Sequence, residues 1–183
     1  MPRKTKRLPR VVAWTELKAP IIDERHVRNR AILSLLAYAG VRRGEVVGLD
    51  VRDYSRSARS VHVRGKGNKD RVIGLPEPAC EALDAYLKQR QGAGAEDPLF
   101  VTTGRRRITH RVVTKAVKRM ARGLGQNLHP HMFRHSYATE LLDRGADLRV
   151  IRDLLGHESV ATTEIYRHVS AARQRSAVQL LEK

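Results

Sequence analysis

Six side chains in this sequence have the types and spacing needed for chemistry on a phosphate group. They are Arg42, Lys66, His131, Arg134, His157 and Tyr166. His131 and Arg134 are three residues apart in a segment with helical periodicity, so they share one face of the predicted helix. Tyr166 follows His157 by nine residues. The other two candidates, Arg42 and Lys66, follow a predicted helix C-terminus and occupy a predicted hairpin tip, respectively.

These residue types suit phosphoryl transfer without a metal ion or another cofactor. Arginine presents a planar fork that matches two phosphate oxygens, and it keeps its proton. Lysine can deliver a proton, and histidine can accept or relay one near neutral pH. A tyrosine oxygen becomes a covalent nucleophile once its proton is removed or shared. Spacing alone does not show that the six groups converge.

Each candidate also has an ordinary structural interpretation. Arg42 and its neighbour Arg43 could be solvated charges, and Lys66 could be a plain loop residue. Tyr166 could lie at the rim of a core on an amphipathic helix.

Two histidines four residues apart, His131 and His135, could instead form half of a zinc site. His129 or His157 would then be the third ligand, but no carboxylate pattern or cysteine completes the site. Residues 65–69 lack the P-loop pattern, and no Gly-x-Ser-x-Gly elbow of a hydrolase is present.

Charge is the unusual feature of the composition. The 183 residues fit one domain, and 41% apolar with 30% charged residues is ordinary for a folded protein. Lysine and arginine number 36 against 19 acidic residues, which gives a formal net charge of +17. Such a surface attracts polyanions, so nucleic acid is the leading partner and an anionic membrane the weaker one. A ribosomal or architectural protein that only coats nucleic acid would have a similar charge.

The single cysteine, Cys80, excludes an intramolecular disulfide and a cysteine-rich zinc site within this sequence, and its helical surroundings indicate a buried thiol. The basic segment 1–7 is not followed by an apolar run of signal-peptide length, and no run reaches membrane-spanning length. We therefore expect a cytoplasmic or nucleoid-associated protein with no membrane partner.

The periodicity predicts a mainly α fold with one small antiparallel β-sheet (α+β). Helices are predicted over about 27–39, 44–49, 77–91, 109–123, 131–144, 148–155, 159–168 and 171–182. Segments 60–64 and 71–75 flank a glycine-rich turn and indicate a hairpin, and 98–102 could form a short strand. No regular element is assigned to residues 13–26.

Four segments resemble the tyrosine recombinase (phage integrase) family, particularly its bacterial Xer-like members. They are 38–49 (YAGVRRGEVVGL), 65–75 (GKGNKDRVIGL), 129–142 (HPHMFRHSYATELL) and 154–169 (LLGHESVATTEIYRHV). Because they occur in the family order over most of residues 30–170, the resemblance implies the catalytic-domain fold of that family.

The resemblance also implies a role for each candidate. Arg42 resembles the first catalytic arginine and Lys66 the hairpin lysine, while Tyr166 matches the nucleophile. His131 and Arg134 match the His-x-x-Arg pair, and the later histidine is His157. Glu45 matches an acidic residue that would orient a basic side chain from behind the site.

In the implied reaction, the tyrosine attacks a DNA phosphate and leaves a 3′-phosphotyrosyl bond and a free 5′-hydroxyl. A 5′-hydroxyl of another strand then reverses the attack, as in integration, excision or a related rearrangement. The resemblance further implies double-stranded DNA as partner, a homotetramer on DNA and a monomer without it. Accessory proteins remain open as further partners.

We expect a basic arm over 1–12, a catalytic domain over 13–170 and a C-terminal helix over 171–183. The resemblance implies that this helix docks on a neighbouring protomer, and the alternative is a helix folded back on its own domain. Most relatives carry an N-terminal core-binding domain that is absent from this sequence, which indicates either a fragment or a recombinase built from the catalytic domain alone.

Two other functions fit the same residues. A type IB topoisomerase would share the fold and the tyrosine chemistry, although the compact His131-x-x-Arg134 motif favours a recombinase. A non-catalytic DNA-binding module would use the same basic surface, and the complete set of six candidates argues against it.

Overall fold

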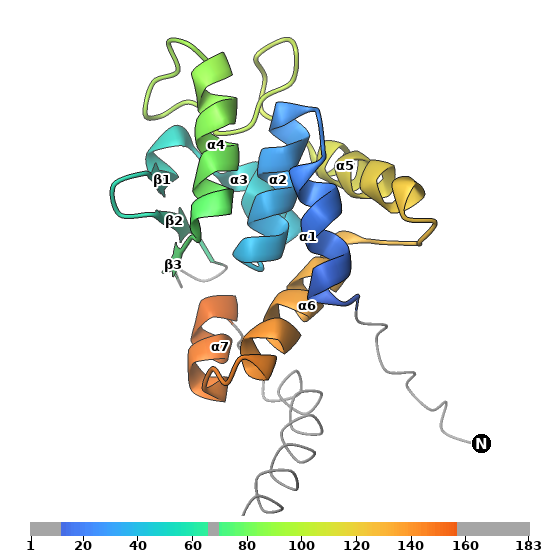
Figure 1. The fold of residues 1–183 in the computed structure, drawn as a ribbon. Coiled ribbons are helices and arrows are strands. Elements are labelled where there is room, and N and C mark those ends of the chain that lie inside the picture. Colours follow the sequence, from blue (N-terminus) through green and yellow to red (C-terminus); the bar gives the residue numbers. More distant parts are fainter. Residues whose placement is uncertain (1–11, 66–69, 157–183) are drawn as a thin grey trace, which may run out of the picture.

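The computed structural model describes residues 12–65 and 70–156, and it shows a mainly helical fold with a small antiparallel sheet (Figure 1). The elements in chain order are α1 Trp14–Ile22, α2 Val27–Tyr38, α3 Arg43–Gly48, the 3₁₀ turn Val51–Asp53, β1 Tyr54–Ser55, β2 Ser60–Val63, β3 Arg71–Gly74, α4 Glu77–Gln89, α5 His110–Gly123, α6 Pro130–Asp143 and α7 Leu148–Leu155. The predicted fold class is confirmed. The helices predicted over 159–168 and 171–182 lie outside the described residues.

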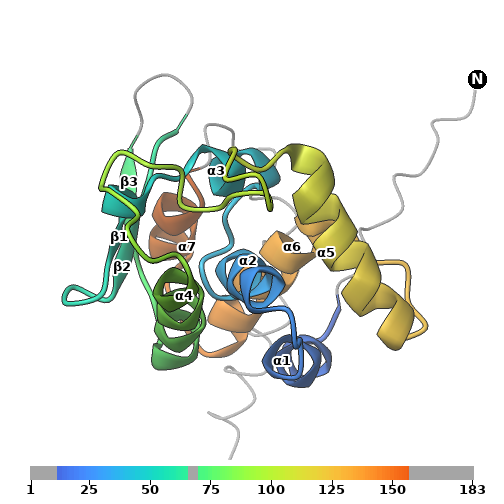
Figure 2. The ribbon, with the colours of Figure 1, turned by 90° about the horizontal axis from the view of Figure 1, so that it is seen from above.

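Helix α2 is the centre of the main core. Figure 2 shows it between α4 and α5, and it also contacts α1, α3 and α6. The sequence predicts one apolar stripe on this helix, but every residue from 31 to 37 is buried. Leu33 and Ala37 are therefore core residues as well, because neighbouring helices enclose α2 on all sides.

Helix α1 is an element that the sequence analysis missed. Pro20 lies inside it, and proline weakens a helix prediction. Tertiary contacts stabilise the helix nonetheless: Leu17 and Ile21 are buried, and the Trp14 ring meets the Tyr38 ring edge-on at 5.0 Å.

The sheet has the order β1-β2-β3 with antiparallel pairing throughout. The predicted hairpin is confirmed, with Val61 opposite Ile73 in β3, and β1 adds a short third strand that was not predicted. Val61 and Ile73 are buried, whereas Val72 on the other face is 64% exposed. The strand suggested over 98–102 is not formed; this segment has only isolated bridges, at Pro98 and Val101.

A tight turn after α2 directs the chain into the candidate site. Gly40 has φ +57°, and a Cβ there would overlap the ring of Tyr137. Only glycine meets both the left-handed backbone and this close approach. The turn places Arg42 at the N-cap of α3.

Helices α6 and α7 form a smaller apolar cluster of their own. Its buried members are Tyr137, Ala138, Leu142, Ile151 and Leu155. Helix α7 ends at Gly156, which adopts the left-handed conformation with φ +60°, as the sequence predicts for a helix stop. The end of this helix therefore has a defined position against α6. Within the described ranges, no helix is long and apolar enough to cross a membrane.

Candidate active site

A basic pocket opens where the start of α3, the base of the β2–β3 hairpin and the start of α6 meet. Its volume is about 580 Å³. The basic and imidazole side chains that line it are Arg42, Arg43, Arg64, Arg71, His110 and His131. The two carboxylates in the lining, Glu45 and Asp53, both form ion pairs with arginines. The pocket is therefore suited to an anion.

Three arginines from three different elements converge on the C-terminal carbonyls of α7. Arg71 on β3 donates through Nε to the Leu154 carbonyl at 2.8 Å. Arg134 on α6 donates to the carbonyl of Leu155. Arg42 donates to the carbonyl of Gly156 at 3.2 Å.

Positive groups at this end of a helix interact favourably with its dipole and satisfy carbonyls that lack an intrahelical partner. Each guanidinium also has a second partner, which fixes its orientation. For Arg134, which is 7% exposed, this partner is the Gly40 carbonyl at 2.8 Å. The fold thus brings together two of the predicted arginines, Arg42 and Arg134, although they lie on different helices.

Glu45 binds two of these arginines at once. Its Oε1 accepts from Arg42 Nη1 at 2.9 Å and from Arg71 Nη1 at 3.0 Å. Its Oε2 accepts from Arg71 Nη2 at 2.8 Å and from the backbone N–H of Arg42 at 2.6 Å. Burial alone would raise the pKa of Glu45, but the hydrogen bonds from Arg71 and Arg42 outweigh it and hold the pKa below its usual value. Glu45 is therefore ionised at neutral pH.

Arg71 belongs to this cluster but was not a candidate in the sequence analysis. Its side chain is 9% exposed, and it makes a two-pronged ion pair with Glu45. The sequence predicted only that Arg71 is the first residue of a strand. Its place within the 65–75 motif was the available signal, but nothing local reveals that the side chain reaches α7.

His131 lies at the start of α6 and lines the pocket. Burial and then the positive charges of His129, Arg43, Arg134 and Arg42 lower its pKa below the ordinary 6.5. Burial, and then the electrostatic effects of His131, Arg134 and His129, lower the pKa of His135. Both imidazoles are therefore neutral near pH 7 and able to accept a proton. Among residues 12–65 and 70–156, no group of three metal-ligating side chains is placed to hold an ion.

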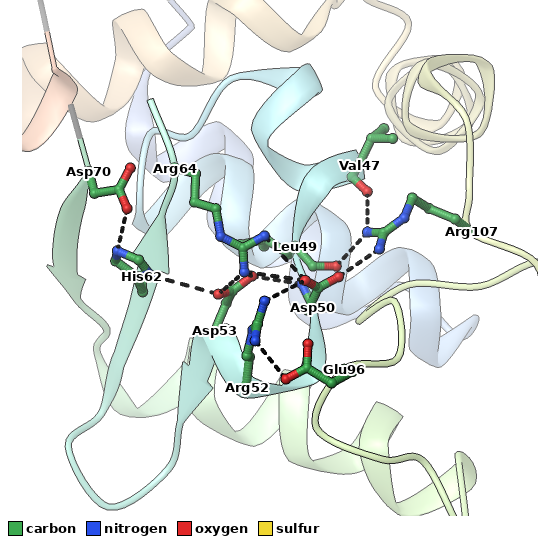
Figure 3. Close-up of polar contacts among 10 residues, drawn as sticks. All are labelled: Val47, Leu49, Asp50, Arg52, Asp53, His62, Arg64, Asp70, Glu96 and Arg107. Carbon is green, nitrogen blue, oxygen red and sulfur yellow. Dashed lines mark hydrogen bonds and ion pairs between the residues drawn. The ribbon is translucent and has the colours of Figure 1, made fainter. Parts of the chain in front are cut away.

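A second ionic network holds the base of the hairpin against the pocket wall (Figure 3). Arg64, at the end of β2, binds Asp50 Oδ2 at 3.2 Å and Asp53 Oδ1 at 2.7 Å. Arg107 binds the other oxygen of Asp50 at 2.6 Å. Hydrogen bonds from Arg107, and then from Arg64, lower the pKa of Asp50 against the effect of burial. These buried carboxylates are therefore paired with arginines that approach from two sides.

The remaining predicted residues, Lys66, His157 and Tyr166, lie outside the described residues. Two of their chain neighbours are described: Gly65 and Gly156 both line the pocket. Cys80 lies on α4 and is buried, as predicted.

Comparison with known proteins agrees with this geometry. The model of the phage integrase family matches residues 11–173, so the chain belongs to that family. Tyrosine recombinase XerD of Halalkalibacterium halodurans is 37% identical over 186 residues, which cover 96% of this chain and 62% of that protein. Across the curated relatives compared, the chain spans 58–62% of their length.

Two solved structures share the fold. XerA recombinase superposes with a TM-score of 0.81 at 34% identity, over 94% of this chain and 66% of that one. XerH site-specific recombinase, bound to its palindromic difH substrate after cleavage, superposes with a TM-score of 0.78 at 27% identity. That match covers 96% of this chain and 54% of the XerH chain.

Proposed function

We propose that this chain is the catalytic domain of a site-specific DNA recombinase that cleaves and rejoins strands through a 3′-phosphotyrosyl intermediate. The observation that carries the proposal is the convergence of Arg42, Arg71 and Arg134 at the end of α7, beside a neutral His131. Family membership and the resemblance to the XerH complex with cleaved DNA support it.

The two predicted arginines bind the non-bridging oxygens of the scissile phosphate. Arg42 is the more accessible of the two, with 41% of its side chain exposed toward the pocket. Arg134 lies beneath it and is held by two backbone carbonyls. Fixed guanidinium groups stabilise the charge that develops in the transition state without having to reorganise. Glu45 and Arg71 are positioning residues, because they act through Arg42 and α7.

Cleavage exchanges one phosphate ester for another. The bond from the Tyr166 oxygen to phosphorus forms while the bond from phosphorus to the 5′-oxygen breaks. His131 takes the tyrosine proton, Lys66 protonates the departing 5′-oxygen, and His157 donates a hydrogen bond to the phosphate. Rejoining reverses these steps with a 5′-hydroxyl from another strand. The covalent ester keeps the phosphodiester energy, so neither ATP nor a metal is part of the proposal.

The partner of this domain is double-stranded DNA, on which it assembles as a homotetramer from free monomers. The catalytic unit spans residues 13–170, with a basic arm at 1–12 and an exchanged C-terminal helix at 171–183. We place the protein in the cytoplasm, where its DNA substrate would lie.

A nicked suicide substrate tests the covalent step. The duplexes carry randomised arms and a nick beside the cleavage point, so that cleavage releases a short strand. Because this strand diffuses away and cannot be rejoined, the protein stays covalently attached to the DNA. We expect the chain to form an adduct stable to SDS, and Tyr166→Phe to form none while still binding DNA. Tyr38→Phe is the matched control, because the buried Tyr38 hydroxyl has no partner among the described residues. A Tyr166→Phe protein that still forms the adduct, or a wild-type chain that binds without one, would contradict the proposal.

A further inference from the structure

Helix α3 has little intrinsic stability, although it carries one of the candidate catalytic arginines. Of its six residues two are glycines, and Val46 is the one that is buried. Helices this short are marginal in water, and glycine weakens them further. Arg42 is the N-cap of this helix, and its side chain lines the pocket. The position of Arg42 therefore depends on the groups that hold the two ends of α3.

Arg107 holds the C-terminal end of α3 (Figure 3). Its Nη1 donates to the Val47 carbonyl at 3.0 Å and to the Leu49 carbonyl at 2.9 Å. In a continuing helix the Val47 carbonyl would accept from the Val51 N–H. That N–H donates instead to the carbonyl of Asp97 at 2.9 Å. The guanidinium thus takes the place of a missing helical donor, and its charge interacts favourably with the helix dipole.

The other nitrogen of the Arg107 fork binds the residue that follows this helix end. Nη2 donates to Asp50 Oδ1 at 2.6 Å, and Asp50 is 7% exposed. Arg64 binds the second oxygen of the same carboxylate. The backbone of Arg107 is fixed as well, because it forms an antiparallel bridge with the buried Val101. One side chain therefore joins three acceptors within four residues of the chain from a well-anchored position.

The two ends of α3 are held by different groups. Glu45 accepts the Arg42 N–H at the first turn, whereas Arg107 reaches the last turn from 60 residues further along the chain. Six residues form a helix only about 9 Å long. A shift at the C-terminal end of so short a helix also moves its N-terminal end. Loss of the Arg107 contacts should therefore displace Arg42.

We propose that Arg107 is a positioning residue for strand cleavage, which holds the C-terminal end of α3 and thereby keeps the Arg42 guanidinium directed at the scissile phosphate. The inference rests on the proposed function, because it requires that Arg42 binds this phosphate. Arg107 acts through the end of α3 and Asp50, so it controls the rate of cleavage more than the affinity for DNA.

A neutral scissile linkage tests this role. Sequencing of the DNA that the wild-type chain traps identifies the cleaved linkage, and a defined duplex is then made with a methylphosphonate at that position. Because a methyl group replaces one charged oxygen, the transition state carries less negative charge and depends less on arginine. Single-turnover rates of strand cleavage, at saturating protein, are compared between this duplex and the ordinary phosphate duplex.

Arg107→Met should cleave the phosphate duplex about a hundredfold more slowly than wild type, as for a displaced catalytic group. On the methylphosphonate duplex this deficit should shrink by about tenfold or more. Arg42→Ala should show the same recovery, because it removes the group that Arg107 positions. Arg107→Lys keeps the charge but not the fork, so its rate on phosphate should be intermediate. Arg106→Met makes the same change at the exposed neighbouring residue and should keep the wild-type ratio of the two rates.

The outcomes separate this inference from the proposed function. A wild-type chain that cleaves neither duplex overturns both, and Arg42→Ala without recovery overturns the role of Arg42 and the inference with it. If Arg42→Ala recovers but Arg107→Met is equally impaired on both duplexes, or is as fast as wild type, only the inference is wrong. Partial unfolding of a variant lowers both rates equally and leaves their ratio unchanged. If Arg107→Met does not fold, Arg107→Lys provides the same comparison.

Discussion

At the residue scale, the protonation state of His131 is set by its neighbours. Burial and four nearby cationic or imidazole groups all disfavour the charged imidazolium, so they act in one direction. The neutral form is the one that can take the proton of a tyrosine nucleophile. A surface histidine with an unshifted pKa would be partly protonated near pH 6.5 and would lose this capacity earlier as the pH falls.

The pH dependence of cleavage should report this shift. As the pH falls through the lowered pKa, His131 becomes protonated and adduct formation slows. We therefore expect the acid limb of the single-turnover rate to have its midpoint below 6.5, the ordinary histidine value. His131→Gln should be slow at all pH values and lack this limb. A wild-type midpoint at or above 6.5, or a limb that persists in His131→Gln, would show that His131 is not the base.

At the scale of elements, Arg71 links β3, α3 and α7. One guanidinium makes the ion pair with Glu45 and also donates to the Leu154 carbonyl. It also packs against Gly156, where a Cβ would lie 3.2 Å from Arg71 Nη1. The smaller α6–α7 cluster is thereby tied to the main body of the domain by polar contacts in addition to apolar packing.

Arg71→Met should destabilise the domain by about 3 kcal/mol at pH 7, because the buried Glu45 loses its two-pronged ion pair and keeps only Arg42 as a partner. Glu45 has a lowered folded pKa, so its contribution to stability is present above its unfolded pKa and is lost as the pH falls through the folded one. The difference between wild type and Arg71→Met should therefore shrink in acid. Urea unfolding at several pH values measures both effects.

Two further variants complete the unfolding experiment. Arg71→Lys keeps the charge but not the fork, so it should recover only part of the loss. Arg149→Met removes an exposed arginine of α7 and should change stability by less than about 0.5 kcal/mol. Equal destabilisation by Arg149→Met and Arg71→Met would show that the contacts of Arg71 with Glu45 and Leu154 do not stabilise the domain.

At the scale of the whole molecule, the C-terminal segment determines how catalytic domains associate in our proposal. Residues 171–183 lie outside the described residues, so the docking prediction rests on sequence. A helix over 171–182 that also continues the turn from Val169 would place Val169, Ala172, Ser176 and Leu180 along one side. A helix with such a stripe needs an apolar groove, on a neighbouring protomer or on its own domain.

Deletion of residues 171–183 distinguishes the two locations. If the tail docks on a neighbour, the truncated chain should lose assembly on paired half-sites, as measured by native gel shift. Attachment of one protomer to one half-site should change much less. Thermal unfolding of the free chain is the control. A truncated monomer that no longer folds would show that the tail belongs to the core of its own domain. That result would overturn the proposed docking of the tail on a neighbouring protomer.

Several elements could be predicted from local signals in the sequence. Residues 27–39 and 109–123 carry apolar residues at helical spacing, and helices occur there as predicted. The hairpin followed from two alternating segments around a glycine-rich turn. Gly40 and Gly156 were correctly predicted as helix stops, because a left-handed residue is a local backbone requirement.

The contacts between polar groups, in contrast, depend on how the elements pack. Helix α1 forms in spite of Pro20 because Leu17 and Ile21 pack in the core, which local propensity does not register. Arg71 reaches Leu154, 83 residues away, and its acceptor is a backbone carbonyl that is present at every position of the chain. A carbonyl becomes a specific partner only where a helix ends and a neighbouring element brings a donor to it. The arginine cluster therefore depends on how α3, β3 and α6 are placed around the end of α7, which periodicity and spacing do not determine.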